Sequence, residues 1–212
     1  MYSYLEESGA MPLSQVLPII QERILHSTSY FGVPALKNPL DFWVYQEIIF
    51  KLRPDIIVEI GNNCGGSALA LAHLLDNLGR GRIIAVDIDQ SRIYPQVLSH
   101  PRISFIEGDA CAVFDQVRRQ IGQTERVLVI EDSSHTYENT LGVLERYSTL
   151  LRSGDIFVVE DSICHHGLDL GPNPGPYEAV ETFVRQEPRF EIDRSLESFL
   201  ITWNPKGFLV CK

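Results

Sequence analysis

The amino-acid sequence predicts a doubly wound α/β fold, in which helices cover both faces of a mostly parallel sheet. Apolar runs and segments of helical character take turns along residues 55–161. The apolar runs are rich in Ile and Val and do not alternate with polar residues, which is typical of parallel strands that are buried on both faces. We expect strands over residues 56–60, 82–88, 102–107, 126–132 and 156–161, with helices over 67–78, 91–98, 112–121 and 137–151 between them.

The segment before the first of these strands favours two helices. Apolar residues at helical spacing predict a helix over residues 14–26, although Pro18 weakens it. Asn38 is a suitable N-cap and Pro39 a suitable first residue for a second helix that runs to about Leu52. Between the two helices we expect an irregular segment.

The C-terminal part predicts an antiparallel edge to the sheet. A loop over residues 162–176 and a helix over 177–186 precede three short apolar runs. The sequence Asn-Pro-Lys-Gly at 204–207 offers Pro and Gly for a tight turn between the last two runs. We therefore expect strands over residues 189–193, 199–203 and 208–212.

Length, composition and charge limit the kind of protein. The chain has 212 residues, of which 44% are hydrophobic, and this is enough for one sizeable core. We expect a single domain over 1–212, with an N-terminal helical lid segment at 1–53 and the core at 54–212. The net charge of −10 leaves no basic stripe for a phosphate backbone, which argues against nucleic acid as a partner.

The cysteines and the apolar runs indicate the cellular compartment in which the protein is expected. Four cysteines lie far apart in the sequence, without the close pairs of zinc sites or redox motifs, which indicates reduced thiols. The N-terminus lacks the pattern of a signal peptide, and no apolar run approaches the length of a membrane span. We expect a cytoplasmic protein without membrane insertion.

Ligands of doubly wound sheets bind at the carboxyl ends of the strands, near the point where the strand order reverses. The first strand leads into a glycine-rich turn, where a ligand can approach the backbone and the amides of a helix N-terminus. Asp87 ends the second strand and is placed to accept hydrogen bonds from ribose hydroxyls. The cofactor-binding candidates at these ends are Glu59, Gly61, Asn62, Gly65, Ser67, Asp87, Asp109 and Ala110.

The glycine spacing indicates which cofactor binds. It departs from the dinucleotide pattern, and the preceding Glu59 favours a cationic or hydroxyl-bearing ligand without a pyrophosphate, such as S-adenosylmethionine. Two alternatives stay open. The glycine-rich turn can be required by chain geometry alone, and Asp109 can cap the helix that starts near Ala112.

The fourth and fifth strands end in the same Glu-Asp-Ser sequence, at 131–133 and 160–162. Because neighbouring parallel strands end at the same edge, Asp132, Glu160 and Asp161 should lie together, where they would repel one another without a cation. Three carboxylates without sulfur suit Mg²⁺. His135 would lie near this metal site and titrates in the right range to take a proton.

Two further readings concern the acids of the fourth strand. Glu131 points to the opposite face of the strand from Asp132, so we give it a structural role. Asp132 itself could be a solvated loop acid.

Several of these segments resemble the cephalosporin hydroxylase/rhamnosyl O-methyltransferase family. The resemblance covers nearly all of residues 32–212 and is carried by GVPALKNPLDFWVYQEIIFKLRPDIIVEIGNNCGGSALALAHLLDNLG, Asp87, DSSH at 132–135, VVED at 158–161 and FEIDRSLESFLITWNPKGFLVCK. It implies a Rossmann-like class I S-adenosylmethionine-binding fold, in a family that includes Mg²⁺-dependent sugar methyltransferases. Ser198 departs from the family pattern, in which many members have a basic residue.

The resemblance also implies roles for individual residues. Asp132, Glu160 and Asp161 match the metal ligands, and His135 matches the general base. The residues that match cofactor positions are Glu59, Gly61, Asp87 and Asp109.

These observations lead to a functional expectation. We expect an S-adenosylmethionine- and Mg²⁺-dependent O-methyltransferase that acts on a hydroxyl of a sugar or a vicinal-diol natural product and, by analogy, forms a homo-oligomer. The N-terminal segment and the 162–176 loop would act as lids, and His165 and His166 in that loop are expected to be solvated. The alternatives are a nicotinamide-dependent oxidoreductase, a hydroxylation protein that needs a partner, and a non-catalytic binding subunit.

Overall fold

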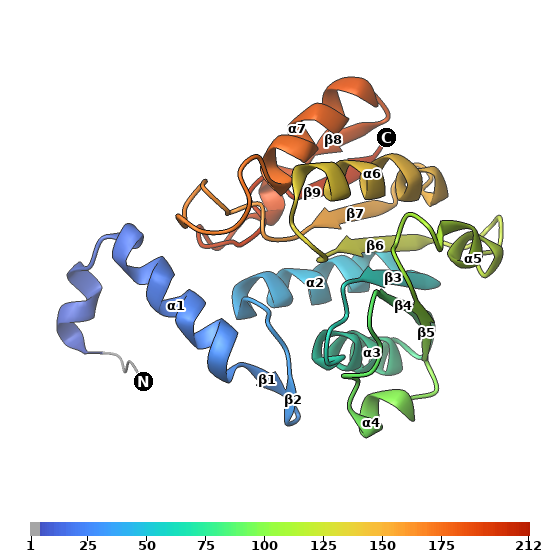
Figure 1. Ribbon diagram of the computed structural model, residues 1–212, viewed down its shortest axis with the longest axis horizontal. Coiled ribbons are helices and arrows are strands. Elements are labelled where there is room, and N and C mark those ends of the chain that lie inside the picture. The colour runs from blue at the N-terminus through green and yellow to red at the C-terminus, as the bar shows by residue number, and fades with distance from the viewer. Residues whose placement is uncertain (1–4) are drawn as a thin grey trace.

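The structure, a computed structural model, describes residues 5–212 and contains a seven-stranded sheet between two layers of helices (Figure 1). Its strand order is β5-β4-β3-β6-β7-β9-β8. The first five strands of this order are parallel, and β9 is antiparallel to both of its neighbours. The strands are β3 (Ile56–Ile60), β4 (Arg82–Asp87), β5 (Ile103–Glu107), β6 (Val127–Glu131), β7 (Ile156–Val159), β8 (Phe190–Ile192) and β9 (Phe208–Cys211). The predicted doubly wound fold with an antiparallel C-terminal edge is confirmed.

The strand order reverses between β3 and β6. From β3 the chain adds β4 and β5 on one side, then crosses back and adds β6 and β7 on the other. The two connections leave β3 and β6 in opposite directions, so the carboxyl ends of these strands border a crevice. The candidate ligand residues lie at this edge.

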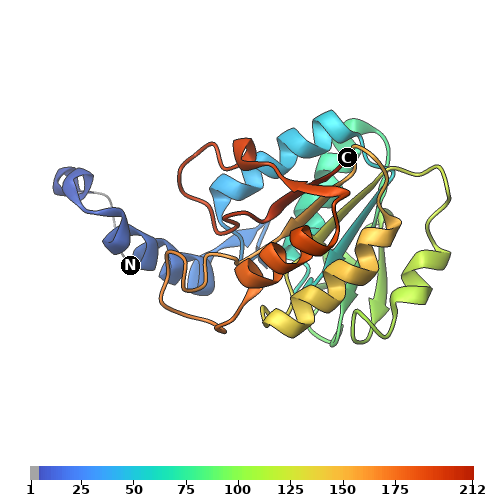
Figure 2. The ribbon, with the colours of Figure 1, turned by 90° about the horizontal axis from the view of Figure 1, so that it is seen from above.

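Successive strand residues point to opposite faces, and each face has its own helices. On one face, Val44 and Ile48 of α2 pack with Ile57 and Ile83 of the sheet. This layer consists of α2 (Pro39–Leu52), α3 (Gly66–Leu78) and α4 (Pro95–Leu98). The opposite layer consists of α5 (Phe114–Arg119), α6 (Tyr137–Tyr147) and α7 (Pro176–Gln186), with α6 and α7 side by side in the view of Figure 2. The sheet is therefore buried on both faces, as its unbroken apolar runs predict.

The start of α2 follows the predicted cap. The side chain of Asn38 accepts a hydrogen bond from the backbone amide of Leu40, and Pro39 is the first helical residue. Arg53 ends the helix in the left-handed conformation, before Pro54. The cap fixes the position of Lys37, which immediately precedes it.

The N-terminal helix α1 (Leu13–Ser27), preceded by the 3-10 helix η1 (Glu6–Ala10), extends to one side of the sheet (Figure 2). Leu17 and Ile24 of α1 pack with Ile163, Leu168 and Trp203 in a separate small apolar cluster. The indole N–H of Trp203 also donates to the side chain of Gln21 at 2.5 Å. This cluster attaches α1 to the loop that follows β7.

Two sequence-based expectations about the strands are wrong. The segment expected to be irregular contains a small hairpin of β1 (Ser29–Tyr30) and β2 (Val33–Pro34). Residues 199–203 form no strand in the described part of the chain, and β9 pairs with β8 and β7 instead. The reason is that Trp203 uses its amide to donate to Asp41 on α2 and its carbonyl to accept from Ile163, so it is not available for a ladder.

Three of the expected helices differ from the structure by two residues or more. The helix expected over residues 91–98 is shortened to α4, and the one expected over 112–121 is shortened to α5. The helix expected over 137–151 divides into α6 and the 3-10 helix η2 (Ser148–Leu150). A further 3-10 helix, η3 (Arg194–Leu196), follows β8.

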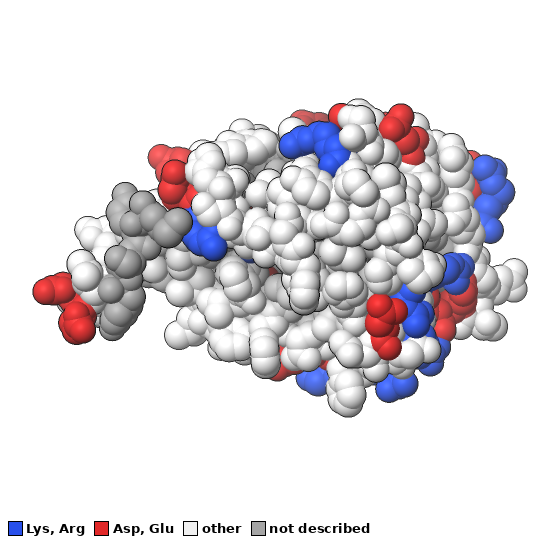
Figure 3. Space-filling model, turned by 90° about the horizontal axis from the view of Figure 1, so that it is seen from below, with Lys and Arg blue, Asp and Glu red and all other residues white. Residues whose placement is uncertain are grey.

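The surface carries both charged and apolar groups. Figure 3 shows one face on which Lys, Arg, Asp and Glu lie mainly toward the rim and the centre is largely uncharged. Several large apolar side chains are exposed, among them Phe31, Trp43, Phe50 and Leu200. Among the described residues, no helix is both long enough and apolar enough to cross a membrane. The expectation of a homo-oligomer stays a prediction.

The two tryptophans provide a test of the cluster that attaches α1. Trp203 is 4% exposed and Trp43 is 58% exposed. Replacement of Trp203 by Ala should lower the free energy of unfolding by about 3 kcal/mol, because it removes a buried aromatic side chain. The matched change Trp43→Ala should stay within about 0.5 kcal/mol of the wild type. Urea unfolding followed by circular dichroism measures both, and equal losses would contradict the packing described here.

Candidate active site

A pocket of about 950 Å³ opens at the carboxyl edge of the parallel strands. This volume lies within the roughly 300–1,000 Å³ typical of small-molecule sites. The candidates from the sequence that line it are Gly61, Asn62, Ser67, Asp87, Asp109, Ala110, Asp132, His135 and Asp161. The other candidates, Glu59, Gly65 and Glu160, are buried behind this lining. The residues that the sequence assigned to one site therefore do lie together.

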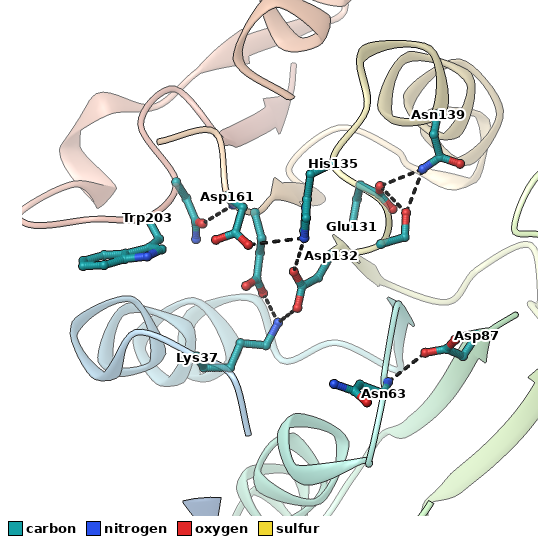
Figure 4. A network of polar contacts seen from close by, with 12 residues as sticks. Lys37, Asn63, Asp87, Glu131, Asp132, His135, Asn139, Asp161 and Trp203 are labelled. Carbon is teal, nitrogen blue, oxygen red and sulfur yellow. Dashed lines mark hydrogen bonds and ion pairs between the residues drawn. The ribbon is translucent and has the colours of Figure 1, made fainter. Parts of the chain in front are cut away.

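The glycine-rich turn over residues 61–67, which we call the cofactor turn, is bonded to β4. The backbone amide of Asn63 donates to Asp87 at 2.7 Å (Figure 4). Asn62 exchanges two hydrogen bonds with Gln90, at 3.1 and 3.2 Å between the side-chain atoms. Gly65 precedes α3 in the left-handed conformation. Asp87 thus orients the turn, and it also faces the pocket.

Gly61 lies where the cofactor turn passes the end of β6. Its φ is +88°, and a Cβ atom on Gly61 would lie 1.9 Å from the carbonyl oxygen of Asp132. Only glycine fits such an approach of two backbone segments. The position of Asp132 therefore depends on the absence of a side chain at Gly61.

Asp109 and Ala110 lie at the β5 end of the pocket. The carboxylate of Asp109 accepts a hydrogen bond from the amide of Ala112 at 2.9 Å in the turn before α5, but the N-cap of α5 is Val113, so the alternative reading of Asp109 as the helix cap is wrong. The carbonyl of Ala110 accepts from the hydroxyl of Tyr147 at 2.8 Å. Both residues line the pocket, so the local bonds of Asp109 are compatible with a role in binding.

His135 converges with two of the predicted metal ligands. Its Nε2 lies 3.3 Å from Asp161 Oδ2 and 3.9 Å from Asp132 Oδ1 (Figure 4). One ligand atom from each of these residues lies within 4.8 Å of the others. Burial alone would lower the pKa of His135, but the carboxylates of Asp161 and Asp132 outweigh it and raise the pKa above its usual value.

Glu160 lies deeper than Asp132 and Asp161 and is held from the α2 side. Its Oε1 accepts hydrogen bonds from Lys37 Nζ at 2.5 Å and from the Tyr45 hydroxyl at 2.8 Å. Lys37 Nζ also lies 2.5 Å from Asp132 Oδ2 (Figure 4). Burial would lower the pKa of Lys37, but Asp132 and Glu160 outweigh it and keep the ammonium charged.

Lys37 and Tyr45, which both donate to Glu160, are residues of the site that the sequence analysis missed. Lys37 precedes the α2 cap in a segment that we expected to be irregular. The available signal was a single cation within the apolar sequence Val-Pro-Ala-Leu-Lys-Asn-Pro-Leu. A cation in such surroundings needs a buried acid as a partner.

Two further carboxylates are buried under the pocket. Glu131 points to the α6 side, where Ser133 and Asn139 donate to its Oε1 at 2.7 and 3.3 Å, in agreement with the structural role expected for it. Glu59 is fully buried, and neither of its oxygens has a hydrogen-bond partner among the described residues. Burial raises the pKa of each of these two acids to about 7.

His165 and His166 find partners in the loop after β7 and at the start of α7. His165 lies 3.1 Å from Asp169 and 3.1 Å from the carbonyl of Gly171. His166 lies 2.6 Å from Glu178 and stacks on Tyr177. These contacts stay within the loop after β7 and the start of α7, and they give neither histidine a place beside His135.

Residues 22–212 match the family described as Rhamnosyl O-methyltransferase/CmcI. The chain belongs to this family. A rhamnosyl O-methyltransferase of Mycobacterium leprae is 34% identical over 196 residues, which cover 89% of this chain and 85% of the relative. One from Mycobacterium tuberculosis (strain ATCC 25618 / H37Rv) is 33% identical over 190 residues, covering 86% and 78%. The expectation of an S-adenosylmethionine-dependent O-methyltransferase is thereby confirmed.

Solved structures agree with the fold. A CmcI structure labelled Mg-SAM has a TM-score of 0.69 and 22% identity, and the match covers 87% of this chain and 76% of that one. An O-methyltransferase from Bacillus cereus in complex with SAH has a TM-score of 0.61 and 16% identity, covering 97% and 94%. The likeness to these structures confirms the class I methyltransferase fold.

Gly61 and Gly79 both have a positive φ, but only Gly61 lies close to another backbone segment. Substitutions at the two positions therefore distinguish the effect of backbone strain from that of steric contact. Gly61→Ala should destabilise the protein by at least about 2 kcal/mol and displace Asp132, because the new Cβ meets the carbonyl of that residue. Gly79 also has a positive φ, but a Cβ there would meet no described atom within 4 Å. Thermal unfolding of Gly61→Ala and Gly79→Ala compares the two. Equal destabilisation would contradict the close approach.

Glu131 should make stability depend on pH. Its pKa is about 7 in the folded protein and 4.5 as a free side chain, so the folded state binds the proton more tightly. The contribution of Glu131 to stability is then greatest below about pH 4.5 and falls as the pH rises to about 7, by at most about 3 kcal/mol. Glu131→Gln keeps an oxygen for Ser133 and Asn139 but removes the titration.

Urea unfolding across this pH range measures the effect. The difference between Glu131→Gln and wild type should grow in favour of the variant as the pH rises. Glu138 on α6 is exposed, and Glu138→Gln should follow the wild-type profile. A Glu131→Gln profile parallel to that of the wild type would exclude this role.

Proposed function

We propose that the protein transfers the methyl group of S-adenosylmethionine to a hydroxyl of a sugar or a vicinal-diol natural product, with Mg²⁺ as a second cofactor. The observation that carries the proposal is the convergence of His135, Asp132 and Asp161 in the same pocket as the cofactor turn. A proton acceptor, a cation site and a cofactor site within one cavity are what transfer to a hydroxyl requires.

The cofactor end of the pocket suits S-adenosylmethionine, which supplies an electrophilic methyl group. Asp87 ends β4 and lies where a ribose would meet the sheet, and its carboxylate can accept from ribose hydroxyls. The glycine spacing of the cofactor turn departs from the pattern of dinucleotide-binding turns, and the fully buried Glu59 lies just before it. A positively charged sulfonium fits these surroundings better than an anion does.

The carboxylate cluster, defined as Asp132, Glu160 and Asp161, suits a hard divalent cation. Burial raises the pKa of Asp132 and Asp161, so their ionised forms are disfavoured, and a bound cation would stabilise them. Oxygen donors of this kind match Mg²⁺, which when bound lowers the pKa of a hydroxyl group. Asp132 and Asp161 face the pocket and would hold the ion, and Glu160, which is more deeply buried, would be its third ligand.

His135 would act as the general base. Its Nε2 faces the two carboxylates, at the point where an acceptor hydroxyl next to the ion would lie. Asp161 orients the imidazole and stabilises its protonated form. Because the neighbouring acids raise the pKa of His135, the neutral form that takes the proton becomes abundant only at a higher pH than for an isolated imidazole.

The acceptor would enter from the side of α1. Gln21, Leu25, Leu36, Leu170 and Trp203 line this part of the pocket. They come from four separate segments, and the apolar members among them would exclude water from around the reacting oxygen. The names of the curated relatives, rhamnosyl O-methyltransferases, support a sugar as the acceptor.

The role of His135 can be tested against a histidine of the neighbouring loop. His135→Ala should lower kcat by at least about a hundredfold while the affinity for S-adenosylhomocysteine stays unchanged, because only the proton acceptor is lost. His166→Ala, which changes a histidine bonded to Glu178, should retain most of the activity. Methyl transfer to a panel of rhamnosides and vicinal diols, together with calorimetric cofactor binding, measures both. Full turnover by His135→Ala would remove this residue from the mechanism.

A further inference from the structure

We propose that Lys37 is an internal counter-cation of the carboxylate cluster and competes with a divalent metal ion for Asp132 and Glu160. The inference rests on the metal site of the proposed function. It goes beyond that function because it gives Lys37, in the segment before α2, a role in controlling metal binding. Lys37 would hold the cluster together without metal and would lower its affinity for metal.

The contacts of Lys37 are those of a bound cation. Its Nζ lies 2.5 Å from one oxygen of Asp132 and 2.5 Å from one oxygen of Glu160. It therefore bridges two strand ends, one from β6 and one from β7. A metal ion held by Asp132 and Glu160 together would need the two carboxylates that Lys37 bridges.

Because the carboxylates of Asp132 and Glu160 are largely withdrawn from water, they need at least one cation beside them. Lys37 is 8% exposed and Glu160 is 6% exposed. Two ionised carboxylates at this depth are strongly unfavourable without a positive partner. Either Lys37 or a metal ion can provide the charge, and the two repel each other when both are close.

The surroundings allow the ammonium group to move but hold the backbone. Lys37 lines the main pocket, so its side chain can withdraw toward that space. Its backbone is held between the α2 cap at Asn38 and Pro34, whose carbonyl oxygen would lie 2.2 Å from a Cβ on Gly66. The long, flexible side chain of a lysine allows its ammonium group to move while its backbone stays in place.

Competition between Lys37 and a metal ion predicts the direction in which metal affinity changes when Lys37 is replaced. Removal of the Lys37 charge should strengthen metal binding, because the carboxylates then have no other cation. If Lys37 instead helped to form the metal site by holding the carboxylates in position, its removal would weaken metal binding. A purely structural ion pair without contact to the metal would leave the affinity unchanged.

The experiment is calorimetric titration of Mg²⁺ alone into metal-free protein at constant pH. The variants are Lys37→Met and Lys37→Gln, of which the second keeps a hydrogen-bond donor without the charge. Lys51→Met, at an exposed position on α2, is the control. We expect both Lys37 variants to bind Mg²⁺ at least about tenfold more tightly than wild type, which corresponds to about 1.4 kcal/mol. The control should stay within about threefold.

Thermal unfolding covers the case in which a Lys37 variant folds poorly without metal. In chelator, Lys37→Met should unfold at a lower temperature than wild type, and Mg²⁺ should raise its midpoint by more than it raises that of the wild type. Equal or weaker Mg²⁺ binding by both Lys37 variants, or an equal Mg²⁺ shift of the midpoint, would overturn the proposal. So would a failure of Mg²⁺ to bind either Lys37 variant.

The readout is independent of methyl transfer. Tighter Mg²⁺ binding by the Lys37 variants without transfer to any acceptor would refute the proposed function and leave this inference standing. Methyl transfer by the wild type, together with unchanged Mg²⁺ affinity in the Lys37 variants, would support the proposed function and refute this inference.

Discussion

The burial of carboxylates at the edge of β3, β6 and β7 is the constraint on which the rest of the site depends. Glu59, Glu131, Asp132, Glu160 and Asp161 lie within electrostatic reach of one another. Among the described residues, the cationic groups that act on this cluster at close range are Lys37 and His135. A core that holds so much negative charge needs a ligand or a counter-charge, and this need links the fold to the chemistry.

The fold supplies the pieces of the site from distant segments. Gly61 brings the cofactor turn against the end of β6, because no side chain separates it from the carbonyl of Asp132. The capped start of α2 brings Lys37 to the same place from the opposite side. Trp203 connects α2, through Asp41, with α1 and the loop after β7, so the acceptor side of the pocket is tied to the same framework.

Most of the sheet could be predicted from the sequence, since buried parallel strands are unbroken apolar runs and their carboxyl ends meet by topology. The meeting of Asp132 with Asp161 followed from the repeated Glu-Asp-Ser sequence, and His135 followed from its spacing. The cofactor turn was recognisable from its glycines and from Asp87. In each case the relevant contact is made by residues near a strand end.

The features that were missed depend on contacts between segments far apart in the sequence. Lys37 reaches Asp132 across 95 positions and Glu160 across 123, and nothing in the local pattern states these pairings. The strand expected over 199–203 is absent from the described residues for a similar reason, because Asp41, far away on α2, accepts a hydrogen bond from the backbone amide of Trp203. Local periodicity cannot report a hydrogen bond that is made by another part of the fold.

The most direct test of the central claim is calorimetric titration with S-adenosylhomocysteine, with and without Mg²⁺, on wild type and Asp161→Asn. We predict cofactor binding in the micromolar range, about −8 kcal/mol, for both proteins, and a response to Mg²⁺ in the wild type that is lost in the variant. Absence of S-adenosylhomocysteine binding to the wild type would contradict the assignment of this pocket as a methyl-transfer site. A Mg²⁺ response that persists in Asp161→Asn would contradict the assignment of its carboxylate to the metal.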